Sequence, residues 1–316
     1  AEDMAIKLGR LHLGDLAWSA HNCHTGLVDL GGTPAGIPIH INRLVIESDL
    51  KIGLGCVYPH PAAGFSGGPK ILAPGAAGYQ TVRALHDQTQ TSRQRGGDIH
   101  TGFRQQIQFI TEKVGLDFIV NATLNQSREI CGVYAGHYQA AFEQAVREAR
   151  RRYAVQPLPA ADIVIADLYP FDIDFQVAMD RGLWPFDFCA AHASRVVLAS
   201  CPQGIGAHEL FPVTHSFTTR LLRRLRTFRP ADLLHLADRL RAARRTIAKQ
   251  NLQAHVLSTH LTSEQLHSAL PKTTLYHRWE DLLEQLIQIH GQSAGVTVAV
   301  YRSAPLMIPS MEGGPK

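Results

Sequence analysis

The chain has 316 residues, of which 45% are hydrophobic and 18% are charged, and its formal net charge at pH 7 is +4. This composition is typical of a globular protein, and the length allows two domains of ordinary size. No apolar run approaches the roughly 18 residues of a membrane span, and the start, AEDMAIKLGR, lacks the apolar core of a signal peptide, so we expect a cytoplasmic protein without a membrane partner.

Five cysteines are scattered along the chain, and none belongs to a C-x-x-C pair. Their spacing argues against a disulfide framework and against a zinc ribbon. We expect these thiols to be reduced and mostly buried. The string AHNCH (residues 20–24) surrounds Cys23 with two histidines, and it leaves two interpretations open: a metal site or a surface connection.

A glycine-rich turn, Gly64 to Gly68, follows the apolar run KIGLGCV (residues 51–57), which predicts a short buried strand. Loops at the carboxyl end of a strand are common ligand sites. Glycine permits positive φ and a close backbone approach, while Pro69 and Pro74 prevent a regular helix from starting at Lys70. We therefore predict that Lys70 lies on an irregular loop.

Two short motifs match this turn only by letter. GFSGG fits the G-x-S-x-G nucleophile elbow, but that motif needs a helix directly after the serine, and GGPKILAPG does not supply one. An α/β hydrolase with Ser66 as nucleophile therefore remains an alternative, but the helix that this motif requires is not predicted. A phosphate-binding loop fits less well still, because Pro69 precedes Lys70 and Ile71 follows it.

After the turn, residues 87–100 are polar and predict a surface loop. Apolar spacing predicts an amphipathic helix over residues 103–114, strands over 116–123 and 128–136, and a helix over 140–155.

The string PLPA (residues 157–160) is the best linker candidate, so we predict domains at 1–156 and 157–316. Beyond it, strands and helices alternate, which predicts an α/β domain with a parallel sheet in three layers. The predicted strands lie within residues 161–167, 194–200, 253–259 and 296–301, and predicted helices lie near 172–182 and 279–289.

Residues 220–249 concentrate the basic side chains, which invites a nucleic-acid interpretation. Leucines recur there at helical spacing, and Pro230 and Asp232 indicate that one helix ends and another begins. This pattern favours the solvated faces of amphipathic helices, and we expect no nucleic-acid partner.

The string PHPAAGFSGGPKILAPGAAGYQTVRALH (residues 59–86) resembles the signature of the nickel-pincer lactate racemase family. The resemblance begins upstream, at LGGTPAGIPIHINRLVIESDLKIGLG, and continues through VGLDFIVNATLNQSREICGVYAG to ADIVIADLYPFDID. It covers most of the first 180 residues in the same order. It implies two α/β domains with the active site in the cleft between them.

The resemblance also implies a role for each of five residues. His60 would be a catalytic acid/base, Lys70 would bond covalently to the cofactor beside Gly67 and Gly68, and His86 would ligate nickel. The cofactor would be a nickel-pincer nucleotide, a pyridinium mononucleotide whose thioamide and thiocarboxylate groups hold Ni(II). The chemistry is consistent, because imidazole titrates near neutral pH, a partly buried lysine is neutral more often, and imidazole with sulfur suits Ni(II).

The implied reaction is racemisation or epimerisation of a 2-hydroxy acid. A histidine would remove the hydroxyl proton while hydride moves to the cofactor, and hydride would return to the other face of the resulting 2-keto acid. The implied partners are a small 2-hydroxy acid and the cofactor-synthesis enzymes. A relative that binds the cofactor without turnover is an alternative, because the T-H-R-like segment with the family's second acid/base is not visible here, and we expect poor racemisation by this chain.

One position departs from the family pattern. Where lactate racemases have a lysine in a Y-P-K-D-I string, this chain has Phe171, two residues after Tyr169. Phe171 and Tyr169 would line the substrate site and favour a larger or less polar acid, or Phe171 would pack between the domains. The sequence leaves both interpretations open.

Overall fold

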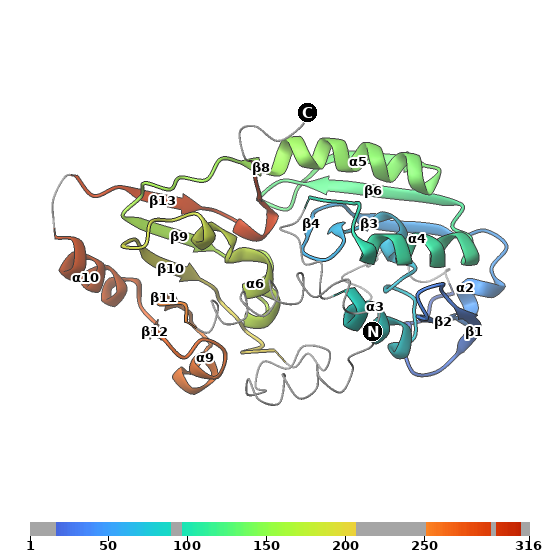
Figure 1. The fold of residues 1–316 in the computed structure, drawn as a ribbon, viewed down its shortest axis with the longest axis horizontal. Coiled ribbons are helices and arrows are strands. Elements are labelled where there is room, and N and C mark those ends of the chain that lie inside the picture. Colours follow the sequence, from blue (N-terminus) through green and yellow to red (C-terminus); the bar gives the residue numbers. More distant parts are fainter. Residues whose placement is uncertain (1–16, 90–96, 207–250, 292–294, 311–316) are drawn as a thin grey trace.

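The computed structural model describes residues 17–89, 97–206, 251–291 and 295–310 (Figure 1). Its two largest sheets lie side by side along the long axis, one built from the first half of the chain and one from the second. The basic segment 220–249 lies outside the described residues. Within the described ranges, no helix is both long enough and apolar enough to cross a membrane.

The first of these sheets has three strands in the order β3-β6-β7: β3 (Ile52–Cys56), β6 (Phe118–Leu124) and β7 (Ile130–Gly136). Strand β6 is parallel to β3 and antiparallel to β7. Helix α5 (Tyr138–Tyr153) covers one face, because its apolar residues recur at helical spacing (Figure 1). The other face is open, so the expectation of a fully buried strand was wrong for β3: Ile52 is 54% exposed and Leu54 is 69% exposed.

A second group of elements packs beside this sheet. It comprises the hairpin β1 (Leu27–Gly32) and β2 (Pro38–Asn42), and the helices α2 (Arg43–Glu47), α3 (Tyr79–Thr89) and α4 (Gly102–Val114). Helix α4 matches its prediction to within one residue, and the Thr101 side chain caps it by accepting the N–H of Arg104 at 3.1 Å. Isoleucines of β2 and α4 fill a common core with Leu85 and Phe103.

The second large sheet confirms the parallel α/β prediction. Its five strands follow the order β12-β11-β10-β9-β13 and are all parallel: β9 (Ile163–Asp167), β10 (Ser194–Leu198), β11 (Ala254–Leu257), β12 (Thr273–Tyr276) and β13 (Val298–Tyr301). Helix α10 (Trp279–His290) packs on one face, and α6 (Phe175–Gly182), η3 (Trp184–Asp187) and α9 (Ser263–Ala269) lie on the other (Figure 1). These layers make the predicted three-layer sandwich.

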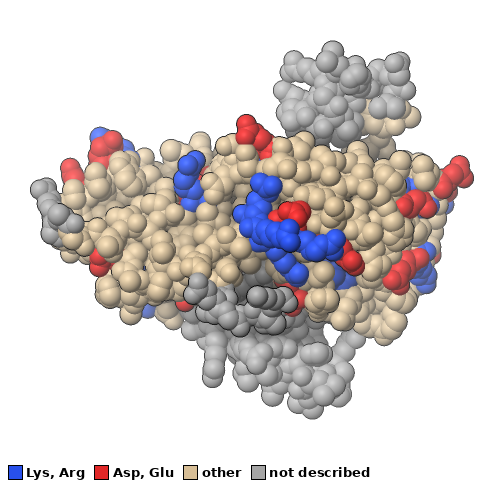
Figure 2. Space-filling view, turned by 90° about the horizontal axis from the view of Figure 1, so that it is seen from above, with Lys and Arg blue, Asp and Glu red and all other residues tan. Residues whose placement is uncertain are grey.

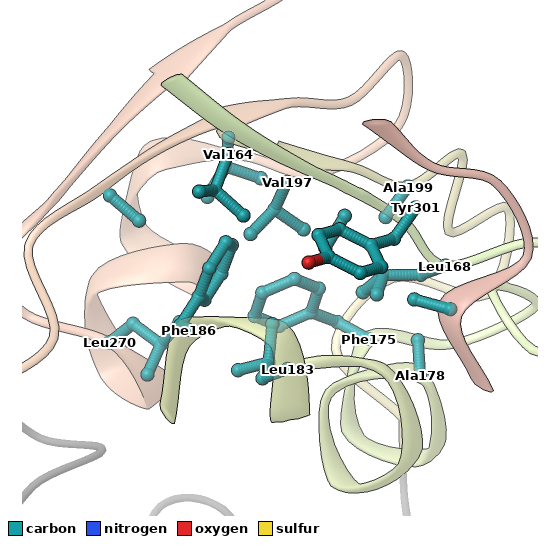
Figure 3. Packing of buried hydrophobic residues seen from close by; sticks show 14 of the residues in the cluster. Val164, Leu168, Phe175, Ala178, Leu183, Phe186, Val197, Ala199, Leu270 and Tyr301 are labelled. Atoms are coloured by element: carbon teal, nitrogen blue, oxygen red, sulfur yellow. The ribbon is translucent and has the colours of Figure 1, made fainter. Parts of the chain in front are cut away.

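Helix α6 is anchored in the core of this sheet. The Asp174 side chain caps it by accepting the N–H of Val177 at 2.8 Å. Phe175 and Ala178 are fully buried, and Figure 3 shows them beside Leu168 and Tyr301. These contacts fix the position of α6, which also carries Arg181.

The end of the chain returns to the first half. Strand β14 (Ile308–Pro309) pairs in parallel with β8 (Ala154–Val155), and Leu306 of η5 (Ala304–Leu306) joins the core under α5. The domain boundary after residue 156 stays a prediction. Figure 2 shows basic side chains gathered where α5 ends in three arginines, the end of a helix that favours cations.

Candidate functional site

The predicted irregular loop consists of two very short strands joined by a tight turn, followed by a single helical turn. Strand β4 (Pro59–His60) pairs with β5 (Gly64–Phe65), and the 3-10 helix η1 (Gly68–Ile71) carries Lys70. Since no α-helix follows Ser66, the strand-turn-helix context of a nucleophile elbow is missing. The alternative of a Ser66 hydrolase therefore gains no support from the backbone.

Gly67 and Gly68 are required by the packing of the loop itself. Their φ angles are +73° and +55°, which side chains rarely adopt. A Cβ on Gly67 would lie 2.7 Å from Oδ1 of Asn121, and one on Gly68 would lie 2.5 Å from the ring of Phe142. The N–H of Gly68 also donates to that Asn121 oxygen at 2.8 Å. Contact of the two glycines with a cofactor stays a prediction.

His60, Lys70 and His86 converge on one aromatic ring. Phe103 of α4 is fully buried, and its ring stacks with His60 at a centroid distance of 6.4 Å. His86 of α3 meets the same ring edge-on at 5.2 Å, and Nζ of Lys70 lies 5.9 Å from the ring centroid. Three separate elements thus bring the three predicted residues together. In the sequence, Phe103 is visible only as one apolar residue of a predicted amphipathic helix.

Hydrogen bonds give the two histidines opposite tautomers. Nδ1 of His86 lies 2.7 Å from the carbonyl oxygen of Val82, so Nδ1 donates and the lone pair is on Nε2, the form that binds a metal. Nδ1 of His60 instead accepts N–H groups from Ala62 and Ala63, both at 3.2 Å. A neutral His60 therefore carries its proton on Nε2 and donates from that atom.

Basic groups crowd the same place. Loss of hydration on burial lowers the pKa of Lys70 well below its usual range, and the charges of Arg181 and Arg104 lower it further. Burial also lowers the pKa of His60, with smaller effects from Lys70, Arg181, Arg104 and His86. Among the described residues, no carboxylate forms an ion pair with Lys70, Arg104 or Arg181. The site is therefore positive and suits an anionic ligand.

The two arginines hold different parts of this site. Arg104 donates to the carbonyl oxygens of Ala63 and Phe65, which fixes the turn, and burial lowers its pKa to about 10. Arg181 reaches across from α6 and donates from Nη1 to the carbonyl oxygen of Pro59 at 3.3 Å. Arg181 thus links the second half of the chain to the residue before His60.

The AHNCH string does not form a metal site. Nε2 of His21 lies 3.0 Å from the carbonyl oxygen of Ala77, and the ring of His24 packs on Tyr79. In the part of the chain that the structure describes, no three His, Cys, Asp or Glu side chains are arranged to hold a metal ion. The described cysteines are all free, as expected, but only Cys201 is buried, so the expectation that most are buried was wrong.

Comparison with known proteins agrees with the signature around Lys70. Residues 1–97 match the family model of the lactate racemase N-terminal domain. The lactate racemase of Thermoanaerobacterium thermosaccharolyticum is 28% identical over 187 residues, and that of Lactiplantibacillus plantarum is 31% identical over 153 residues. In sequence, the first half of the chain is therefore similar to lactate racemases. These matches cover 58% and 47% of this chain, but only 44% and 36% of the two relatives.

Two solved structures share the fold of this chain. The lactate racemase apoprotein from T. thermosaccharolyticum superimposes with a TM-score of 0.73 at 20% identity, covering 98% of this chain and 75% of that one. A protein from Thermotoga maritima gives 0.63 at 15% identity, covering 98% and 82%. These likenesses confirm the α/β fold class.

The two predicted substrate residues lie differently in this fold. Phe171 is partly buried and packs against the core of the first half, with its ring centroid 5.1 Å from that of Tyr58. The guanidinium of Arg181 lies over the same ring at 4.6 Å. Tyr169 is 42% exposed. A role of either residue in substrate binding stays a prediction.

Proposed function

We propose that this chain is a lactate racemase-like isomerase that racemises or epimerises a 2-hydroxy acid with a nickel-pincer nucleotide tethered to Lys70. The observation that supports it most is the meeting of Lys70, His60 and His86 on the ring of Phe103. The partners would be a small 2-hydroxy acid and the cofactor-synthesis enzymes.

The described residues fit the proposed group. One neutral imidazole with its lone pair on Nε2 cannot bind a metal ion tightly alone, so the remaining ligands would come from the nucleotide. A lysine with a lowered pKa is a better nucleophile for a covalent bond. The Nδ2 atom of Asn121 and Nη1 of Arg104 are buried without a described hydrogen-bond partner, which leaves donors for a ligand beside Gly68. When bound, the group would accept hydride from the substrate carbon and return it.

The residues of the chain would do the remaining work. Phe103 would keep water from the three groups on its ring. In the observed tautomer His60 would donate its Nε2 proton to the substrate oxygen. To take the hydroxyl proton at Nε2 as a base, the ring would first have to release the N–H groups of Ala62 and Ala63 and carry its own proton on Nδ1. The lowered pKa of His60 keeps the ring neutral between such transfers.

The test is the mass of the Lys70 peptide after production of the chain together with the cofactor-synthesis enzymes. We expect an adduct on Lys70, and we expect bound nickel to fall in His86→Ala. Lys113→Ala and His137→Ala alter exposed residues away from Phe103 and should change neither quantity. An unmodified Lys70 under these conditions would contradict the proposal. An adduct without racemisation of any 2-hydroxy acid would support the cofactor-binding alternative, and fluorophosphonate labelling of Ser66 would support the hydrolase.

A further inference from the structure

Arg181 reaches the site from a rigid support. Phe175 and Ala178, six and three residues before Arg181 on α6, are fully buried in the core beneath the five-stranded sheet (Figure 3). Gly182 lies so close to Leu168 and Pro305 that a Cβ could not be added without a clash. Because α6 cannot move without disturbing this core, the guanidinium is held at a fixed place relative to β4.

Two aromatic rings orient this guanidinium. Its central carbon lies 4.6 Å from the ring centroid of Phe171 and 5.8 Å from that of Tyr58. The rings pack on each other at 5.1 Å, so they form one wall beside the arginine. Arginine stacks on such rings while its N–H groups, which lie in the guanidinium plane, remain available to acceptors.

The donors of Arg181 are mostly unused within the described chain. A guanidinium has five N–H donors, and the described contact is a single bond from Nη1 to a neutral carbonyl oxygen. Arg104, by contrast, donates hydrogen bonds from Nε and Nη2 to carbonyl oxygens of the turn. Burial lowers the pKa of Arg181, and the charge of the neighbouring Asp180 offsets this effect only in part. An anionic ligand would relieve the remaining cost of the buried charge.

We propose that Arg181 binds the carboxylate of the substrate, and that Phe171 and Tyr58 hold its guanidinium for this contact. The assignment rests on the proposed function. In a 2-hydroxy acid, the carboxylate carbon is bonded to the carbon that bears the hydroxyl group. A residue that binds the carboxylate must therefore lie beside the group that handles the hydroxyl proton, and Arg181 contacts the residue directly before His60. A planar guanidinium pairs well with a carboxylate through two parallel hydrogen bonds.

A nucleotide phosphate is the other source of an oxyanion for this site, and ligand titration distinguishes the two. The 316-residue chain without cofactor is titrated with glycolate, the smallest 2-hydroxy acid, and separately with inorganic phosphate. For Arg181→Met we expect glycolate affinity to fall roughly 10- to 100-fold, the usual effect of a lost charge-assisted pair. Arg195→Met is the matched control, because Arg195 also donates to carbonyl oxygens, but it does so on β10. It should bind glycolate like the wild type.

Each result decides for or against Arg181. Unchanged glycolate affinity in Arg181→Met overturns the assignment, and so does a loss confined to phosphate. If Arg181→Met does not fold, Arg181→Lys decides, because lysine keeps the charge but cannot form the bidentate pair; wild-type affinity then overturns the proposal. The Lys70 adduct should form normally in Arg181→Lys. A missing adduct in the wild type, with glycolate binding still dependent on Arg181, contradicts the proposed function and leaves the carboxylate site in place.

Discussion

The Nζ atom of Lys70 lies 5.9 Å from the centroid of the Phe103 ring, so an ammonium group from η1 meets a buried aromatic side chain of α4. An aromatic face attracts a cation, but it does not replace the water or the carboxylate that a charged lysine normally has. The lowered pKa of Lys70 expresses this cost, and it also makes the amine more reactive.

Replacing Lys70 by methionine should therefore stabilise the chain. In the unfolded chain lysine keeps its proton up to about pH 10.4, whereas the folded site releases it at lower pH. The cost of Lys70 is largest below its folded pKa, shrinks as pH rises from that value toward the unfolded pKa, and is absent above the unfolded pKa. At pH 7 we expect Lys70→Met to raise the free energy of unfolding by more than the about 0.5 kcal/mol that surface substitutions produce.

The measurement is urea unfolding of the chain without cofactor at pH 7 and near pH 10.5. Lys113→Met replaces an exposed lysine of α4 and should leave the free energy of unfolding nearly unchanged at both values. A Lys70→Met variant that is less stable than wild type at pH 7 would show that the lysine is fixed by a favourable charge contact instead.

Nuclear magnetic resonance can test the tautomers of the two histidines. We expect the Nδ1 atom of His60 to be unprotonated at neutral pH and that of His86 to carry a proton, because the first accepts N–H groups and the second donates to Val82. The lowered pKa of His60 also means that this ring stays neutral at pH values where a model-peptide histidine gains a proton, near 6.5. His60→Ala and His86→Ala assign the signals. The same tautomer for both rings would contradict the geometry.

Local patterns in the sequence predicted much of this fold. Helices α4 and α5 and the parallel strands β9 and β10 follow from apolar periodicity, which needs no knowledge of distant contacts. The four residues of β12 were missed, because such a short strand carries little pattern of its own. The open face of β3 was missed for another reason. Which side of a strand is covered depends on where η1 and α5 pack, and no local pattern contains that.

The candidate site divides in the same way. The family signature at residues 59–86 located His60, Lys70 and His86, because all three lie at fixed spacing within that one segment. Phe103 and Arg181 come from helices outside that string, and their roles arise only when the chain folds. A buried phenylalanine in a helix and a basic residue at the end of another look ordinary in sequence.

The Gly68→Ala substitution should destabilise the turn strongly. The φ angle of +55° is strained for alanine, and the added Cβ would lie 2.5 Å from the ring of Phe142 in α5. Strain and overpacking together should lower the free energy of unfolding by about 2 to 4 kcal/mol. Gly102→Ala is the matched control, since nothing lies within 4 Å of its Cβ position at the start of α4. Equal stability of both variants in urea would mean that the turn adapts easily.

Substitution of Phe171 separates its two proposed roles. Phe171→Leu keeps apolar volume but removes the ring beneath Arg181, so unfolding should cost about 1 kcal/mol less and glycolate affinity should fall a few-fold. A loss of stability with wild-type glycolate affinity would make Phe171 a packing residue only.

The Phe171→Lys variant introduces the ammonium group that lactate racemases have at this position. In active protein, we expect relative rates to shift toward lactate if position 171 lines the substrate site. Relative rates that stay the same for lactate, malate, a sugar acid and an aryl-substituted hydroxy acid would place Phe171 outside that site.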